Sequence, residues 1–395
     1  MENHDAPPPP TPSTPLTPSS LETPAASSSP LSPAPHAPPR HPRINLALQG
    51  GGSHGAFTWG VLDALLEDGR IDFEGISGTS AGAMNAVAMA QGFASAKARN
   101  SADPRSDARE SLANFWESVI EMGSLTQTQR DVFDTLFGAI GLMASPAGSW
   151  INSMATEWTK AVSPYEINPL DFNPLRQLLE KHIDFDALQH NKALKLFVVA
   201  TRVSTGKAEV FSGRHLTAKA VLASACLPTA FQAIEIDGEH YWDGGYSGNP
   251  AIHPLIYQCE SRDVLLVQIN PMKSPDLPTT GAEIMDRISE ITFNAGLIAE
   301  MRAIDFVKRL LAEGKLDPGR YKDVLLHRID GGDALRSYDG ASKTSTSSTL
   351  LHTLRDLGAA ATKHWLSHKF NALGVHSSVH IQRDYLDDLR LPAKL

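Results

Sequence analysis

Two glycine-rich turns, each placed between a short apolar run and a helical pattern, constrain the fold of this chain most. The first turn, residues 50–55, follows an apolar run at 44–48 and precedes a helical pattern that stops at Gly69. The second turn, residues 78–82, follows the run at 73–77 and again precedes a helical pattern. Buried strands that alternate with helices predict a parallel sheet with helical crossover connections.

Three later runs of Val, Leu and Ile predict further buried strands, at residues 194–200, 264–269 and 324–329. Between them, Asp237-Gly238 is a two-residue hairpin turn signal, flanked by strand patterns at 233–236 and 239–242. We therefore expect a three-layer α/β/α fold with a mainly parallel central sheet.

Composition divides the chain into three parts. Residues 1–43 consist largely of Pro, Ser, Thr and Ala, which predicts a disordered tail. Residues 44–280 form the expected α/β domain, in which 95–188 reads as a helical insertion and the helix after the second turn ends near residue 91. Residues 281–395 predict a mainly helical C-terminal extension.

Charge and composition exclude several classes of protein. A net charge of −9 without clustered Lys and Arg excludes a nucleic-acid partner. No run approaches the roughly 18 apolar residues of a spanning helix, and the acidic start does not resemble a secretory signal. Cys226 and Cys259 form no disulfide framework or metal-ligand spacing, and we expect both to be buried. These features favour a cytoplasmic protein.

The second turn reads Gly78-Thr79-Ser80-Ala81-Gly82, which fits the G-x-S-x-G nucleophile elbow. In such an elbow the serine sits on a cramped turn between strand and helix, so its neighbours at two positions before and after must be small. The helix start beyond it directs amide groups and a positive dipole end at the site. Ser80 is therefore the candidate nucleophile.

The first turn is the candidate oxyanion hole, because backbone N–H groups of a glycine loop can converge on a developing negative charge. Its residues are Gly50, Gly51, Gly52, Ser53, His54 and Gly55. The alternative is a dinucleotide-binding G-x-G-x-x-G, with Asp72 and Glu74 as the acid about 20 residues on. Such an acid should end the second strand, where this chain has Gly78 and Ser80, and no later cofactor signal follows.

A serine hydroxyl needs a base within hydrogen-bond reach. Asp243-Gly244-Gly245 follows the hairpin, and a carboxylate shielded from water there would have a raised pKa. By itself this tripeptide is an ordinary turn. A Ser-His-Asp triad is the alternative, with His253 or His327 as the base.

Together these motifs resemble the patatin-like phospholipases, which carry a glycine-rich oxyanion motif, a G-x-S-x-G elbow and a late D-G-A/G in this order. The resemblance covers residues 44–255 and includes 222–228, which look like the family's A-S-x-x-x-P segment. One position departs from it, because the family commonly has Arg or Lys where this chain has His54. We interpret His54 as a structural substitute rather than a group that tunes the site to mildly acidic pH.

The resemblance implies a lipid acyl hydrolase with a Ser80–Asp243 dyad and an acyl-enzyme intermediate, and no cofactor or metal. Amides of Gly51, Gly52 and Ser53 would stabilise the oxyanion. Its substrate would be a lipid ester, met by peripheral contact with a membrane or lipid aggregate. Residues 135–144 are either the apolar element that meets this interface or an ordinary buried helix. A regulatory lipid-binding protein of the same fold is the alternative function.

Overall fold

The computed structural model describes residues 41–124, 163–191, 193–274, 277–338, 342–343 and 345–387. These residues belong to one compact unit that begins at His41. The apolar element expected at 135–144 and the tail up to residue 40 lie outside the described residues. Among the helices of the described ranges, none combines the length and apolar character needed to cross a bilayer.

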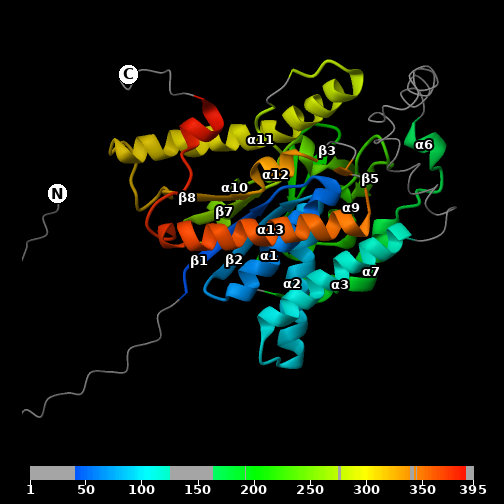
Figure 1. The fold of residues 1–395 in the computed structure, drawn as a ribbon, viewed down its shortest axis with the longest axis horizontal. Coiled ribbons are helices and arrows are strands. Elements are labelled where there is room, and N and C mark those ends of the chain that lie inside the picture. The colour runs from blue at the N-terminus through cyan, green and yellow to red at the C-terminus, as the bar shows by residue number, and fades with distance from the viewer. Residues whose placement is uncertain are drawn as a thin grey trace, which may run out of the picture. The chain divides into compact units, whose positions relative to one another are not determined.

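The unit is built on an eight-stranded sheet with the order β5-β6-β3-β2-β1-β7-β8, in which β4 pairs with β3 (Figure 1). The strands are β1 (Arg43–Leu48), β2 (Asp72–Thr79), β3 (Lys195–Arg202), β4 (Ala208–Phe211), β5 (Ile234–Ile236), β6 (Glu239–Asp243), β7 (Asp263–Gln268) and β8 (Leu325–Asp330). The five neighbouring strands β3, β2, β1, β7 and β8 pair in parallel. Strands β4 and β6 pair antiparallel with β3, and β5 pairs antiparallel with β6. The mainly parallel sheet and the hairpin are thus confirmed.

Helices cover both faces of this sheet. They are α1 (Gly55–Asp68), α2 (Ala81–Arg99), α3 (Pro104–Ser124), α6 (Pro164–Ile167), α7 (Pro174–His182), α8 (Phe185–Gln189), α9 (Ala218–Ser224), α10 (His253–Gln258), α11 (Gly281–Ala312), α12 (Gly332–Arg336) and α13 (Ser348–Lys369). The turn of 3-10 helix η1 (Gly52–His54) precedes α1, and another, η3 (Gly244–Tyr246), follows β6. Helix α2 runs past residue 91, where its end was expected, because the apolar face continues to Ala96.

Alternating side chains of the central strands feed two separate cores. Leu265 and Val267 of β7 pack into the core that holds α1, α2, α3 and α13. Val264 and Leu266 of the same strand pack on the other face, with Leu297 and other residues of α11. Figure 1 shows α13 and α11 on these opposite sides of the sheet. Strand β7 is therefore buried on both faces, as its run of Val and Leu predicts.

The part of the chain after residue 280 is tied closely to this framework. Strand β8 extends the sheet beside β7, and α13 packs along α1 through Leu351 and Leu354. The boundary between a catalytic domain and a C-terminal extension at residue 280 stays a prediction. The described helices within 95–188 are the end of α2, α3, α6, α7 and α8, and whether they form an insertion stays a prediction. Cys226 and Cys259 are free and buried, as expected.

Candidate active site

Ser80 lies at the turn between β2 and α2 with a φ of 53° and a ψ of −122°. A non-glycine residue rarely adopts a positive φ, so the surrounding contacts must hold this conformation in place. Its backbone N–H donates to Ser224 Oγ at 2.9 Å, and the Ser224 hydroxyl donates to the Val199 carbonyl at 2.5 Å. Ser224 thus ties the elbow to β3. It lies in the 222–228 segment, but the sequence motif alone does not reveal this contact.

The elbow is as cramped as the G-x-S-x-G pattern requires. A Cβ on Gly82 would lie 2.3 Å from the Leu48 carbonyl oxygen, and one on Gly78 would lie 2.6 Å from the Gly82 carbonyl oxygen. Larger residues would push α2 away from the strand ends. Because Ala81 begins a helix of 19 residues, the positive end of the α2 dipole is directed at Ser80.

The glycine loop meets this elbow directly. A Cβ on Gly50 would lie 2.6 Å from the Thr79 carbonyl oxygen and 2.7 Å from Ser80 Cβ, so only glycine permits the approach. Gly51 follows in the turn from β1, residues 52–54 form η1, and Gly55 begins α1. The structure therefore brings the two predicted glycine-rich turns together at the carboxyl ends of β1 and β2.

Two asparagines that the sequence reading did not identify hold Gly50. Its N–H donates to Asn249 Oδ1 at 2.6 Å, and its carbonyl accepts from Asn270 Nδ2 at 2.6 Å. Gln49 Oε1 accepts from the backbone N–H groups of Ile269 and Asn270, both at 2.9 Å. Glycine signals mark the loop in the sequence, whereas these polar partners come from 199 or more positions away and carry no local signal.

Asp243 ends β6 beside Ala200 of β3 and is only 1% exposed. Burial raises the pKa of its carboxyl from 3.8 to about 7, and hydrogen bonds from the Gly245 N–H and the Ser80 side chain partly oppose this rise. The bond from Gly245 N to Asp243 Oδ1 is 2.7 Å long. The structure thus places Ser80 and Asp243 in contact, with a carboxyl whose pKa is near neutral.

The two histidines of the alternative triad lie in other contacts. His253 Nδ1 pairs with Glu300 Oε1 at 3.0 Å. His327 is fully buried on β8, where its Nε2 pairs with Asp263 Oδ1 at 2.9 Å. Asp263 begins β7, whereas Ser80 follows the end of the parallel strand β2. The His327–Asp263 pair therefore lies toward the amino ends of the strands, and Ser80 lies at their carboxyl ends.

The acids of the dinucleotide alternative lie at the same far edge. Asp72 and Glu74 belong to the start of β2, while the glycine loop follows the end of the parallel strand β1. Glu74 is buried and accepts from the backbone N–H groups of Glu260 and Ser261 at 2.7 and 2.9 Å. The Glu74 carboxylate therefore binds backbone groups at the other end of the strand from the glycine loop. It cannot serve as the acid that a dinucleotide site requires beside that loop.

His54 is 2% exposed, and its Nε2 lies 2.6 Å from Ser342 Oγ. Burial, together with the charge of Lys343, lowers the pKa of the imidazole to about 3. His54 is therefore neutral at any pH near physiological. This supports the interpretation of His54 as a structural residue.

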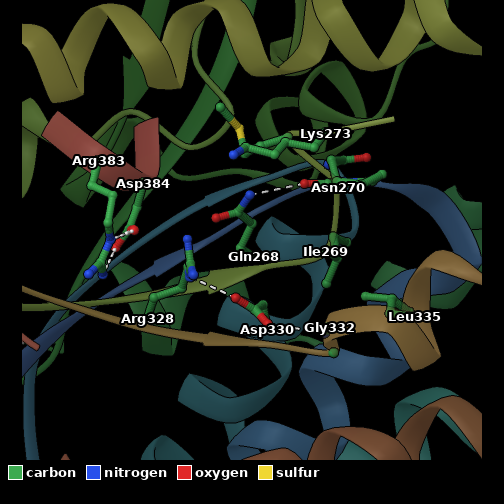
Figure 2. A pocket seen from close by; sticks show the side chains of 13 residues that line it. Gln268, Ile269, Asn270, Lys273, Arg328, Asp330, Gly332, Leu335, Arg383 and Asp384 are labelled. Carbon is green, nitrogen blue, oxygen red and sulfur yellow. Dashed lines mark hydrogen bonds and ion pairs between the residues drawn. The ribbon is translucent and has the colours of Figure 1, made fainter. Parts of the chain in front are cut away.

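A pocket of about 430 Å³ opens at the ends of β7 and β8, next to the glycine loop. Figure 2 shows Arg383 and Asp384 at one side of it and Ile269 and Leu335 at the other. Ser80 and Asp243 do not line this pocket, so it is separate from the candidate catalytic pair. Within the described ranges, no group of three or more His, Cys, Asp or Glu side chains is arranged to hold a metal ion.

The chain was compared with known proteins. The family model described as patatin-like phospholipase matches residues 46–256, and no curated protein matches the sequence significantly. Among solved structures, VipD from Legionella pneumophila is 15% identical with a TM-score of 0.38, over 83% of this chain and 67% of that chain. ExoU of Pseudomonas aeruginosa, in its complex with SpcU, is 15% identical with a TM-score of 0.25, over 85% and 73%. With more than half of its length matched by the family model, this chain belongs to the patatin-like phospholipase family.

Proposed function

We propose that this protein hydrolyses carboxylic ester bonds of lipids with Ser80 as nucleophile and Asp243 as general base. The observation that carries the proposal is the buried Asp243 carboxyl, in hydrogen-bond contact with Ser80 and with a pKa raised to about 7. A base with such a pKa is largely ionised just above neutral pH and still accepts a proton readily. Membership of the family supports a lipid substrate.

In the acylation step, Ser80 Oγ attacks the ester carbonyl carbon while its proton passes to Asp243. The carbonyl oxygen becomes an oxyanion, and the amides of Gly51, Gly52 and Ser53 donate to it. Each such donor contributes about 3 to 4 kcal/mol in enzymes where one has been removed. The tetrahedral intermediate then collapses, the leaving alcohol takes the proton from Asp243, and the acyl group stays on Ser80.

In the deacylation step, a water molecule attacks the acyl-serine carbonyl and gives a proton to Asp243. The second tetrahedral intermediate breaks its bond to Ser80 Oγ, which recovers the proton from Asp243. A free fatty acid leaves, and both residues return to their starting states. The burial that raises the pKa of Asp243 thus serves both half-reactions, because the same carboxyl accepts and returns a proton in each.

Labelling with a fluorophosphonate probe tests the proposal. We expect the wild-type protein to be labelled covalently and Ser80→Ala not to be, since phosphonylation requires an activated serine. A wild-type protein that stays unlabelled while folded would refute the hydrolase and favour the regulatory lipid-binding protein. Incubation with a mixed lipid extract, followed by identification of the fatty acids and lyso-products released, then defines the head group and acyl chain.

A further inference from the structure

The glycine loop is completed by residues that lie outside the matched region 46–256. Asn270, just after β7 at the rim of the pocket in Figure 2, donates to the Gly50 carbonyl at 2.6 Å. Lys343 Nζ in turn donates to Asn270 Oδ1 at 3.2 Å. Three residues from distant parts of the chain therefore form a linear relay that ends on the loop beside Ser80.

The relay controls the direction of one proposed oxyanion donor. In a planar trans peptide, the carbonyl of Gly50 and the N–H of Gly51 are fixed relative to one another and point in opposite directions. The hydrogen bond from Asn270 to the Gly50 carbonyl therefore sets the direction of the Gly51 N–H. A second bond to the same carbonyl, from Asn249 Nδ2, is longer at 3.4 Å.

An asparagine side chain ends in an oxygen that accepts and an NH₂ group that donates, and its neighbours determine which of the two faces a given partner. Rotated by half a turn, the Asn270 side chain would present its NH₂ group to the Lys343 ammonium and its oxygen to the Gly50 carbonyl. Both contacts would be repulsive. Lys343 thus favours the orientation in which Asn270 donates to the loop, together with Gln49 Oε1, which accepts from Asn270 Nδ2 at 3.4 Å.

The backbone of Lys343 also packs on the loop. A Cβ on Gly52, whose φ is +57°, would lie 2.2 Å from the Lys343 carbonyl oxygen, so the two backbones are in direct contact. The hydroxyl of the preceding residue, Ser342, is the partner of His54. Burial lowers the pKa of Lys343, while the charges of Glu290 and Asp286 on α11 oppose that effect. Lys343 thus contacts the loop through its backbone as well as through Asn270.

We infer that Lys343 is a positioning residue, which acts through Asn270 to aim the Gly51 amide at the oxyanion. The inference rests on the proposed function, because it assigns a task within that same site. Lys343 does not touch the reacting atoms. Its loss is expected to weaken binding of the transition state and to leave binding of the ground-state ester largely intact.

Steady-state kinetics on a chromogenic p-nitrophenyl ester tests this role. Removing one oxyanion donor lowers kcat about 100-fold or more, so misdirecting one should lower kcat about 10-fold in Lys343→Met, with KM little changed. Lys343→Arg keeps a charged donor and should recover most of kcat. In an Asn270→Ala background, Lys343→Met should have little further effect, because both changes break the same relay.

Matched variants separate this inference from the alternatives. Lys363→Met removes an exposed lysine of α13 and should keep wild-type kinetics. If thermal unfolding shows that Lys343→Met is unfolded, Asn270→Asp replaces it, because its carboxylate still pairs with Lys343 but cannot donate to Gly50. Wild-type kcat in a folded Lys343→Met or Asn270→Asp variant, or additive losses in the double variant, would overturn the inference. The proposed function fails separately, if the wild type does not hydrolyse the ester or Ser80→Ala still does.

Discussion

Asp243→Asn should separate activity from stability, because the carboxyl that the mechanism needs is costly to bury. Its pKa rises from 3.8 to about 7 in the folded protein. At about 1.4 kcal/mol for each pKa unit, keeping this group ionised opposes folding by about 4 kcal/mol. Asparagine has nearly the same shape and can still accept the Gly245 N–H, but it carries no charge to desolvate.

The sign of the effect depends on pH. The folded-state pKa of Asp243 is raised, so the folded protein holds this proton more tightly than the unfolded chain does. The resulting contribution to the free energy of unfolding is fully present below pH 3.8, and it is lost as the pH rises toward 7. The Asn variant has no such dependence at this position. Asp243→Asn should therefore match the wild type near pH 4 and exceed its free energy of unfolding by up to about 4 kcal/mol at pH 8. Hydrolysis should be lost at both values.

Urea denaturation of both proteins between pH 4 and pH 8 measures this difference, since other carboxyls titrate alike in the two and cancel. Fluorophosphonate labelling of the same samples reports on Ser80. Equal stability at pH 8, or a gain that does not shrink toward pH 4, would show that Asp243 is not a desolvated carboxylate. The argument for a near-neutral base would then fail, whatever the activity of the variant.

Three further predictions concern the same site. Because Asp243 must be unprotonated to accept the Ser80 proton, kcat/KM should rise with pH to a plateau above 7 and be about 100-fold lower at pH 5; a flat profile would contradict the assigned base. Ser224→Ala removes the two hydrogen bonds that link Ser80 N to the Val199 carbonyl through Ser224 Oγ. The free energy of unfolding should therefore fall by about 1–3 kcal/mol and kcat should fall, which urea denaturation and steady-state kinetics measure. His253→Ala should change kcat by no more than about twofold, whereas a triad would lose orders of magnitude.

The sequence predicts those parts of the site that depend on local chain geometry. Gly78, Ser80 and Gly82 mark the elbow because a turn this tight excludes side chains at neighbouring positions. Glycines likewise mark the loop after β1, and Asp237-Gly238 marks the hairpin that leads to Asp243. In each case the required residue types stand within a few positions of one another, so a short motif records them, although the atoms that exclude a side chain at Gly50 and Gly82 belong to Thr79 and Leu48.

The partners that hold the loop could not be predicted in this way. Asn249 and Asn270 reach Gly50 across 199 and 220 positions, and an isolated Asn or Lys has no spacing that distinguishes it from a surface residue. The neutrality of His54 depends on its burial beside Ser342 and Lys343, which also follows only from the fold. The sequence does not predict the last two turns of α2 for a simpler reason, since its small Ala residues give a weak apolar pattern.

The position of β1 explains why the residues after 256 matter to the site. Strand β1 pairs with β2 on one side and with β7 on the other, and β7 begins only at Asp263. Without β7, the buried strand β1 would have an unpaired edge, and the loop that leaves it would lack Asn270. Strained backbone at Ser80 costs about 1–3 kcal/mol, and the buried Asp243 costs more. Such a site persists only where its surroundings over-determine it, and β7, Asn270 and Lys343 supply that support from beyond the matched region.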